Sequence, residues 1–149
     1  MTEARSTAQR KADALAVLER GGHAWLSTAS QGRPQVIGVS AWWDGALLTI
    51  STRDGTVTAR NLDAGGDARV AFGTPDDAVV VDTRLEASFP AASAPPEVAN
   101  GFEAAMGWNP AEVGPGWRYF RLRLRRVEVF RGYDETPGRD VMKDGGWLA

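Results

Sequence analysis

A group of hydroxyl, guanidinium and amide side chains beginning at residue 52 has the composition of an anion site. The stretch TRDGTVTARNL supplies Thr52, Thr56, Thr58, Arg60 and Asn61. It follows an apolar run and leads into a predicted short helix. Backbone N–H groups at the start of a helix carry the positive end of its dipole, so they favour an anion such as phosphate. Thr56 could equally be an ordinary N-cap, which needs no ligand. The residues alone leave both interpretations open.

The chain has few residues that could support other kinds of chemistry, such as nucleophilic catalysis or metal binding. It contains no cysteine, which excludes thiolate nucleophiles and cysteine-based metal sites. His23 is the only histidine, and we interpret it as a partly buried structural residue rather than a base. No GxSxG sequence presents a nucleophilic serine. The acidic pairs at 76–77 and 134–135 are typical of turns. We therefore expect no metal site and no hydrolytic triad, and binding chemistry is what remains.

Length and charge narrow the class of protein. The chain has 149 residues, of which 43% are hydrophobic, and a formal net charge of -2. We expect a single domain over 1–149, with an N-terminal helix within 1–22 and an inserted loop and helix over 89–116. The weakly negative charge is a poor match for nucleic acid or an anionic membrane. With no long apolar run and no signal peptide, we expect a cytoplasmic protein.

The hydrophobic pattern predicts strands interrupted by a few helices. A leading helix over 8–20 places Ala12, Leu15 and Leu18 near one face and ends at two glycines. Strands are predicted over 23–28, 36–43, 46–52, 68–73, 78–88 and 118–133, and further helices from near residue 56 and over 97–108. Residues 89–96 contain three prolines and are predicted to form a loop.

Two local features of the predicted strands are specific enough to test. Asp44-Gly45 joins two apolar runs and predicts a type I′ hairpin, which needs positive φ. In the last strand, apolar residues alternate with arginines until Arg125-Arg126, where the alternation changes phase. A strand cannot change phase without an extra residue, so we predict a β-bulge there. The arginine face of this strand is either a solvated outer face or an anion-binding surface.

Trp42 and Trp43 are adjacent on one predicted strand, so they must face opposite sides of the sheet. One of them is then exposed for a partner or a flat ligand, or a twisted small barrel hides both. Six strands, two to four helices and no regular alternation of strand and helix predict a mainly β (α+β) fold built on a small antiparallel barrel.

The order of these segments resembles the pyridoxamine 5′-phosphate oxidase-like family of FMN-binding split barrels. The matching segments are Leu26-Ser27-Thr28, Gly32-Arg33-Pro34, the turn at Asp44-Gly45, Thr58-Ala59-Arg60-Asn61-Leu62 and Arg69-Val70-Ala71-Phe72. The closing GRDVMKDGGWL is similar to the tail of small actinobacterial members. The resemblance covers about residues 23–148, and the ordered set carries it rather than any single motif.

This resemblance implies a homodimer of six-stranded split β-barrels that binds FMN or the deazaflavin F-420 at the subunit interface. The cofactor phosphate would lie near Thr52, Thr56, Thr58, Arg60 and Asn61. The ring system would lie along 36–42, with its polar edge against Gly38, Val39 and Ser40. The chain departs from the family at two positions, because Thr58 stands where a lysine is common and Val57 where FMN-dependent oxidases have arginine. Arg60 and Arg53 are the cations that could compensate.

Three functions follow as hypotheses. The first is a flavoprotein oxidoreductase that transfers a hydride between bound FMN or F-420 and a small-molecule substrate. The second is a non-catalytic protein that binds a flavin, a haem-related pigment or another flat ligand in the same fold. The third is a dimer without a cofactor that only binds a partner. The sequence identifies no catalytic residue for the first.

Overall fold

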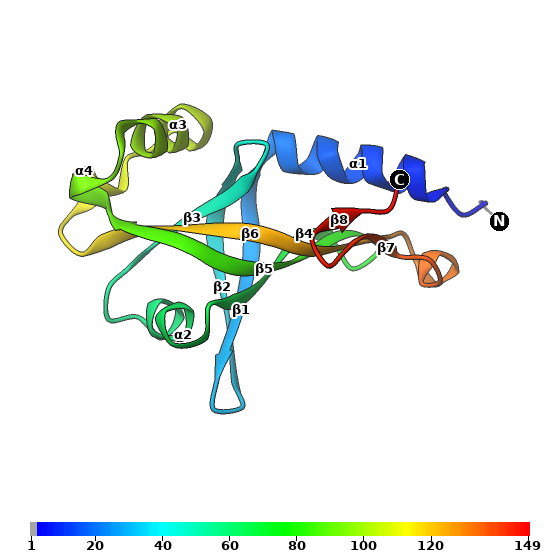
Figure 1. The fold of residues 1–149 in the computed structure, drawn as a ribbon, viewed down its shortest axis with the longest axis horizontal. Helices are drawn as coiled ribbons and strands as arrows, with labels where there is room; N and C mark the ends of the chain where they lie inside the picture. Colours follow the sequence, from blue (N-terminus) through cyan, green and yellow to red (C-terminus); the bar gives the residue numbers. More distant parts are fainter. Residues whose placement is uncertain (1–2) are drawn as a thin grey trace.

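Six antiparallel strands form the barrel in the computed structural model, which describes residues 3–149 (Figure 1). They are β1 (Gly22–Ser30), β2 (Arg33–Trp43), β3 (Leu47–Arg53), β4 (Asp67–Thr74), β5 (Asp77–Pro90) and β6 (Trp117–Phe130). The order is β3-β2-β1-β4-β5-β6, and pairing between β3 and β6 closes the ring. Two short strands, β7 (Asp140–Lys143) and β8 (Gly146–Trp147), extend the sheet beyond β6. The predicted mainly β split-barrel fold is confirmed.

Helices pack outside this barrel. They are α1 (Thr7–Arg20), α2 (Val57–Gly65), α3 (Pro96–Met106) and the short α4 (Pro110–Val113), with 3-10 turns η1 (Ala91–Ser93) and η2 (Tyr133–Glu135). In Figure 1, α1 and α3 lie toward opposite ends of the molecule, and the β1–β2 hairpin projects beyond α2. Among residues 3–149, no helix combines the length and apolar character needed to cross a membrane.

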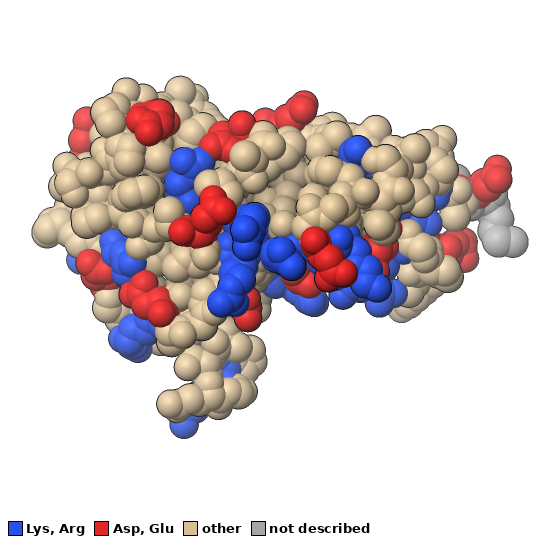
Figure 2. Space-filling view, in the orientation of Figure 1, with Lys and Arg blue, Asp and Glu red and all other residues tan. Residues whose placement is uncertain are grey.

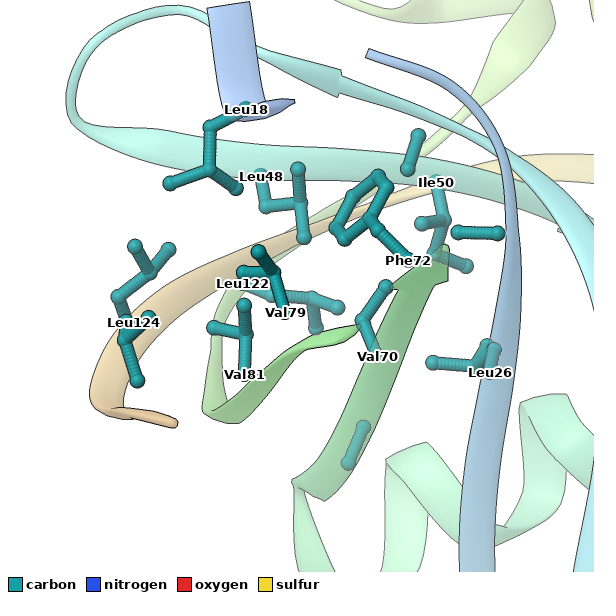
Figure 3. Packing of buried hydrophobic residues seen from close by; sticks show 14 of the residues in the cluster. Leu18, Leu26, Leu48, Ile50, Val70, Phe72, Val79, Val81, Leu122 and Leu124 are labelled. Carbon is teal, nitrogen blue, oxygen red and sulfur yellow. The ribbon is translucent and has the colours of Figure 1, made fainter. Parts of the chain in front are cut away.

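The barrel interior is aliphatic. Leu48, Ile50, Val70, Val81 and Leu122 are fully buried, and they point toward one another from β3, β4, β5 and β6 (Figure 3). Alternation along each strand places every second residue inside, which is the period-two pattern seen in the sequence.

Helix α1 begins at a capping box, in which the Ser6 hydroxyl accepts from the N–H of Gln9 and the Gln9 side chain accepts from the N–H of Ser6. Its buried face is Arg10, Ala14 and Leu18. The predicted face was therefore only partly right, because Leu18 is buried but Ala12 is exposed. The buried face of α1 includes Arg10, where only apolar residues were expected.

The β2–β3 hairpin is present, but its turn differs from the prediction. Trp43 pairs with Leu48, and the Asp44 N–H donates to the Leu47 carbonyl at 3.1 Å. The two central residues are thus Gly45 and Ala46, and only Gly45 has positive φ. This is the type II′ pattern. Asp44 stands before the turn and accepts from the N–H of Ala46 and Leu47.

Two other hairpins have the type I′ geometry that was expected at residue 44. Gln31-Gly32 joins β1 to β2, and Asp144-Gly145 joins β7 to β8, with positive φ at both central positions of each. The hairpin of β7 and β8 was not predicted. The sequence feature that indicates this hairpin is Asp144-Gly145. The segment had only been compared with the tail of family members.

The predicted β-bulge in β6 is confirmed. Asp82 of β5 pairs with Arg126, and the next residue, Thr83, pairs with Leu124. Arg125 is therefore the extra residue, which is how the strand changes phase. The predicted loop over 89–96 was wrong at its start, since Phe89 pairs with Tyr119 and Pro90 with Arg118. Proline is tolerated there because it ends the strand.

Helix α3 packs against β2 and β6 through a second, aromatic cluster. Its buried members are Ala91, Val98, Phe102 and Tyr119, with Trp42, Trp108 and Trp117 partly buried against them. Gly101 is essential to this packing, because an added Cβ would lie 2.2 Å from the Trp42 ring. The missing side chain of Gly101 thus leaves a notch in α3 that the Trp42 ring fills.

Candidate functional site

The first turn of α2 is the centre of the candidate site. Thr56 is its N-cap: the hydroxyl accepts from the Ala59 N–H at 3.1 Å and donates to the Arg53 carbonyl at 2.8 Å. The cap interpretation is therefore confirmed. It does not exclude an anion, because the N–H groups of Val57 and Thr58 precede the first residue that can reach a helical carbonyl. A capped helix start with two free N–H groups is still a phosphate-binding arrangement.

Arg60 supplies the positive charge at this helix start. Its Nη1 donates to the Gly55 carbonyl at 2.6 Å, so the exposed guanidinium folds back over the turn before α2. Arg53 is exposed at the end of β3 and forms no ion pair within the described chain. Both cations named as possible replacements for the missing lysine and arginine therefore lie within a few residues of the cap.

Three of the predicted phosphate residues have buried side chains. Thr52, Thr58 and Asn61 are 7%, 2% and 6% exposed. The Asn61 amide donates to the Thr28 hydroxyl at 3.1 Å, which ties α2 to β1. These three side chains lie beneath the surface at the helix start, whereas Thr56 is half-buried and Arg60 is exposed.

The two departures from the family pattern have different structural consequences. Thr58 is nearly fully buried and, as a threonine, brings no cation, so only its backbone N–H could meet an anion. Val57 is 41% exposed at the first position of α2, where an arginine would reach solvent. This makes Arg60 the one cationic side chain on α2.

Acidic residues next to α2 are already neutralised. Arg118 of β6 bonds Asp63 through two nitrogens, at 2.8 and 2.9 Å, and also contacts Asp54 at 3.2 Å. The hydrogen bond from Arg118 holds the pKa of Asp63 below its ordinary value. Since both carboxylates have a cationic partner, they compete little with an anion for Arg60.

The predicted ring-binding strand has a free backbone edge. Strand β2 pairs with β1 over residues 33–41, but β2 pairs with β3 only at Trp42 and Trp43. Before Trp42, the second edge of β2 has no strand neighbour among residues 3–149. Gly38 is exposed, Ser40 is half-buried and the Val39 side chain points into the core. Unpaired backbone groups on such an edge can bond to a polar ligand edge.

Two tryptophans near this strand were not predicted as site residues. The Trp108 indole N–H donates to the Ser40 hydroxyl at 3.2 Å, so the segment after α3 reaches the candidate ring-binding strand. Trp25 pairs with Gly38 in the sheet and is 57% exposed. The alternation of HAWLST places Trp25 opposite the buried Ala24 and Leu26, and this was the signal that sequence reasoning missed.

Trp42, Trp43 and His23 occupy positions that differ in part from those expected from the sequence. Trp42 and Trp43 do face opposite sides, and both are half-buried, Trp42 against α3 and Trp43 against the barrel core. The exposed tryptophan is Trp25 instead. His23 is exposed on the outer face of β1, so its expected burial was wrong.

Comparison with known proteins gives structural matches only. No protein-family model matches the chain, and no curated protein matches it. An F-420 reductase structure matches with a TM-score of 0.62 and 20% identity, over 75% of this chain and 93% of that one. A pyridoxamine 5′-phosphate oxidase candidate from Listeria innocua matches with a TM-score of 0.62 and 13% identity, over 80% and 96%. A FAD-binding protein from Mesorhizobium loti matches with 0.62 and 18%, over 78% and 89%.

Each of these structures matches three quarters or more of this chain. At such low identity they establish the fold and not the activity. The chain has the fold of the pyridoxamine 5′-phosphate oxidase-like split barrels.

Proposed function

We propose that the protein is an oxidoreductase that holds FMN or F-420 and exchanges a hydride with a small-molecule substrate. When bound, the cofactor supplies the hydride chemistry, and the protein supplies binding, orientation and exclusion of water. The observation that carries the proposal is the first turn of α2, where a capped helix start, two free N–H groups and Arg60 converge.

Different residues of the chain would bind the phosphate and the ring of such a cofactor. The N–H groups of Val57 and Thr58 and the guanidinium of Arg60 would bind the phosphate, since charge-assisted hydrogen bonds to an oxyanion are the strong ones. Thr56 and the buried Asn61 keep the helix start in place. The free edge of β2 near Gly38 and Ser40 would meet the polar edge of the ring, and Trp108 orients Ser40 through its hydrogen bond.

We also propose that the active form is a homodimer with the cofactor at the subunit interface. Trp25 and Val36 are each 57% exposed, and they flank Gly38 on one face of the β1–β2 hairpin. An unpaired strand edge next to exposed apolar side chains favours association. The expected result in sedimentation is a dimer for the native chain and a monomer for Trp25→Arg. A native chain that sediments as a monomer with the cofactor bound would contradict this part.

A non-catalytic role in binding a flat ligand is the second candidate. The observation that favours it is the chemistry around the strand that would hold the ring: Gly38, Val39 and Ser40 offer no ionisable side chain, and Thr58 supplies no cation. Such a protein would bind FMN, F-420 or a pigment and catalyse no turnover.

Parallel titration with FMN and F-420 tests the proposal. Six tryptophans give a strong fluorescence signal to follow. The proposal expects micromolar binding of one cofactor, followed by oxidation of its reduced form when a suitable acceptor is added. Binding without turnover against a broad panel of acceptors would favour the second candidate. Failure to bind either cofactor would contradict the oxidoreductase and would leave only the pigment-binding form of the second candidate.

A further inference from the structure

A furrow separate from the α2 site crosses the outer surface of four neighbouring strands. It has a volume of about 590 Å³ and is lined by residues 27–29 of β1, 67–69 of β4, 82–84 of β5 and Arg125 of β6. Since adjacent strands lie about 4.8 Å apart, the furrow spans about 14 Å from β1 to β6. Its volume lies in the range of small-molecule sites, and none of its lining residues belongs to α2.

Two ion pairs form the sides of this furrow. Arg69 bonds Asp82 through two nitrogens, at 2.5 and 3.2 Å, and Arg84 bonds Asp67 at 2.9 Å. Each pair joins directly opposed residues of β4 and β5. The charges of these two arginines are therefore already matched.

Arg125 is different from the other lining arginines. Its side chain is exposed and forms no ion pair with any residue of 3–149, while its carbonyl accepts from the Gly145 N–H at 2.8 Å. As the extra residue of the β6 bulge, Arg125 has no partner position on β5. Bulges re-aim side chains in this way. The charged residues that line the furrow are three arginines and two aspartates, which gives the lining a net positive charge. Arg125 also lines an adjoining pocket with Asp140 and Asp144, but it forms an ion pair with neither of them.

The neighbouring arginines on β6 show how unusual this is. Arg121 is paired with Asp44, Arg123 lies 3.8 Å from Glu86, and Arg126 bonds Asp140 at 2.8 Å. Figure 2 shows the general pattern on one face, where a band of basic side chains over β5 and β6 has acidic side chains among them. Most of the arginine face is thus a solvated, ion-paired surface, and Arg125 is the exception within residues 121–126.

We propose that this furrow binds a small acidic molecule, with Arg125 anchoring its carboxylate or phosphate group. A guanidinium matches either oxyanion with two parallel hydrogen bonds. The furrow's length suits an elongated molecule whose polar body lies along Ser27 and the two ion pairs. None of the residues that line the furrow belongs to the phosphate site proposed at α2, although Thr28 in the furrow accepts a hydrogen bond from Asn61 of that site. Separate variants, at Arg125 and at Arg60, therefore test the two sites.

Calorimetric titration of the full-length protein with citrate and with pyrophosphate tests the inference. The expected result is saturable binding of at least one probe at millimolar concentrations, weakened about tenfold or more by Arg125→Ala. Binding of citrate alone would identify a carboxylate ligand, and binding of pyrophosphate alone a phosphate ligand. Arg123→Ala is the matched control, because Arg123 is exposed on the same strand and does not line the furrow; it should change affinity less than twofold.

Further measurements separate this site from the cofactor site and from a folding defect. Arg125→Ala should leave the affinity for FMN or F-420 unchanged, and Arg60→Ala should leave citrate or pyrophosphate binding unchanged. If Arg125→Ala unfolds, Arg125→Gln replaces it, since the amide retains most of the side-chain length without the charge. Equal affinity of the wild type and the charge-removing variant, or no binding of either probe, would overturn the inference.

Discussion

The helices α1 and α3 are attached to the same barrel by different kinds of interaction. The start of helix α1 is held by charged and hydrogen-bonding groups, while its Ala14 and Leu18 pack in the barrel core; α3 is held by aromatic rings. The first attachment should depend on pH and on intact hydrogen bonds, while the second should depend on shape. Since the segment after α3 reaches Ser40, the shape-dependent attachment is the one next to the candidate cofactor strand.

The attachment of α1 is a polar network with a buried arginine. The Arg10 guanidinium is almost fully buried and donates to the carbonyls of Val129, Glu135 and Pro137, at 3.2, 2.8 and 3.3 Å. The Glu135 carboxylate, 4% exposed, bonds Arg5 and the Arg131 N–H. This network joins the two ends of the chain across more than a hundred residues.

The attachment of α3 is a set of ring contacts. Phe102 meets Trp108 and Tyr119 edge to face, with centroids 5.6 and 5.3 Å apart, and Trp108 meets Trp117 at 5.4 Å. Trp42 fills the notch at Gly101. Among residues 3–149, the hydroxyl of the fully buried Tyr119 has no hydrogen-bond partner, so no hydrogen bond from this atom adds to the attachment of α3.

The largest effect is expected from the α1 network. Arg10→Ala removes the donor to four carbonyls, two of them through buried hydrogen bonds, so it should lower the free energy of unfolding by about 3 kcal/mol. Urea denaturation measures this change. Arg20→Ala, which removes an exposed arginine from the same helix, should change stability by less than about 1 kcal/mol. Equal losses in the two variants would show that the hydrogen bonds of Arg10 do not stabilise the attachment of α1.

The pH dependence of the free energy of unfolding that comes from the α1 network should be nearly as large as the effect of Arg10→Ala. The hydrogen bond from Arg5 lowers the pKa of Glu135 from 4.5 to about 2. Because the folded-state pKa is lower than the unfolded one, this stabilisation is complete above pH 4.5 and is lost as pH falls toward 2. We expect a loss of about 2 kcal/mol over that interval. Glu135→Gln should flatten the profile there, and an unchanged slope would contradict the role of this carboxylate.

A change of shape should affect α3 to a smaller but specific extent. Gly101→Ala places a methyl group against Trp42, so it should destabilise the protein by about 1 to 3 kcal/mol and change its tryptophan emission. Gly65→Ala is the matched control, because that glycine is also helical and has open space around its Cα. It should stabilise the protein by up to about 1 kcal/mol. Destabilisation by both variants alike would argue against the notch.

The smallest effect is expected at Tyr119. Tyr119→Phe removes a buried hydroxyl that has no partner, so the free energy of unfolding should rise or stay within about 1 kcal/mol of the wild type. Thermal unfolding measures it. A larger loss would show that this hydroxyl is hydrogen-bonded in solution and that the α3 attachment has a polar component.

Periodicity predicted much of the fold. The change of phase at Arg125-Arg126 could be located because a strand has a strict period of two, and Thr56 could be identified as a cap because its side-chain chemistry acts within three residues. The strand at Phe89-Pro90 could not be predicted, since its formation depends on the distant partners Tyr119 and Arg118. The turn type at Gly45 depends likewise on which residues of the two strands pair.

The candidate site was predicted less completely than the fold. The helix start expected within 52–62 is present, capped by Thr56, but the sequence could not show that the side chains of Thr52, Thr58 and Asn61 are buried. Burial depends on how α2 docks on β1, which local sequence does not encode. The contact between Trp108 and Ser40 joins residues 68 positions apart, so no local pattern indicates it.

The most direct test of the central claim compares each cofactor with its phosphate-free counterpart. Affinities of FMN and riboflavin, and of F-420 and its deazaflavin without phosphate, would be measured for the wild type, for Arg60→Ala and for the control Arg20→Ala. The account predicts that Arg60→Ala weakens the phosphorylated ligand by about tenfold and leaves the phosphate-free ligand unchanged. Equal weakening of both ligands, or of neither, would contradict a phosphate site at the start of α2.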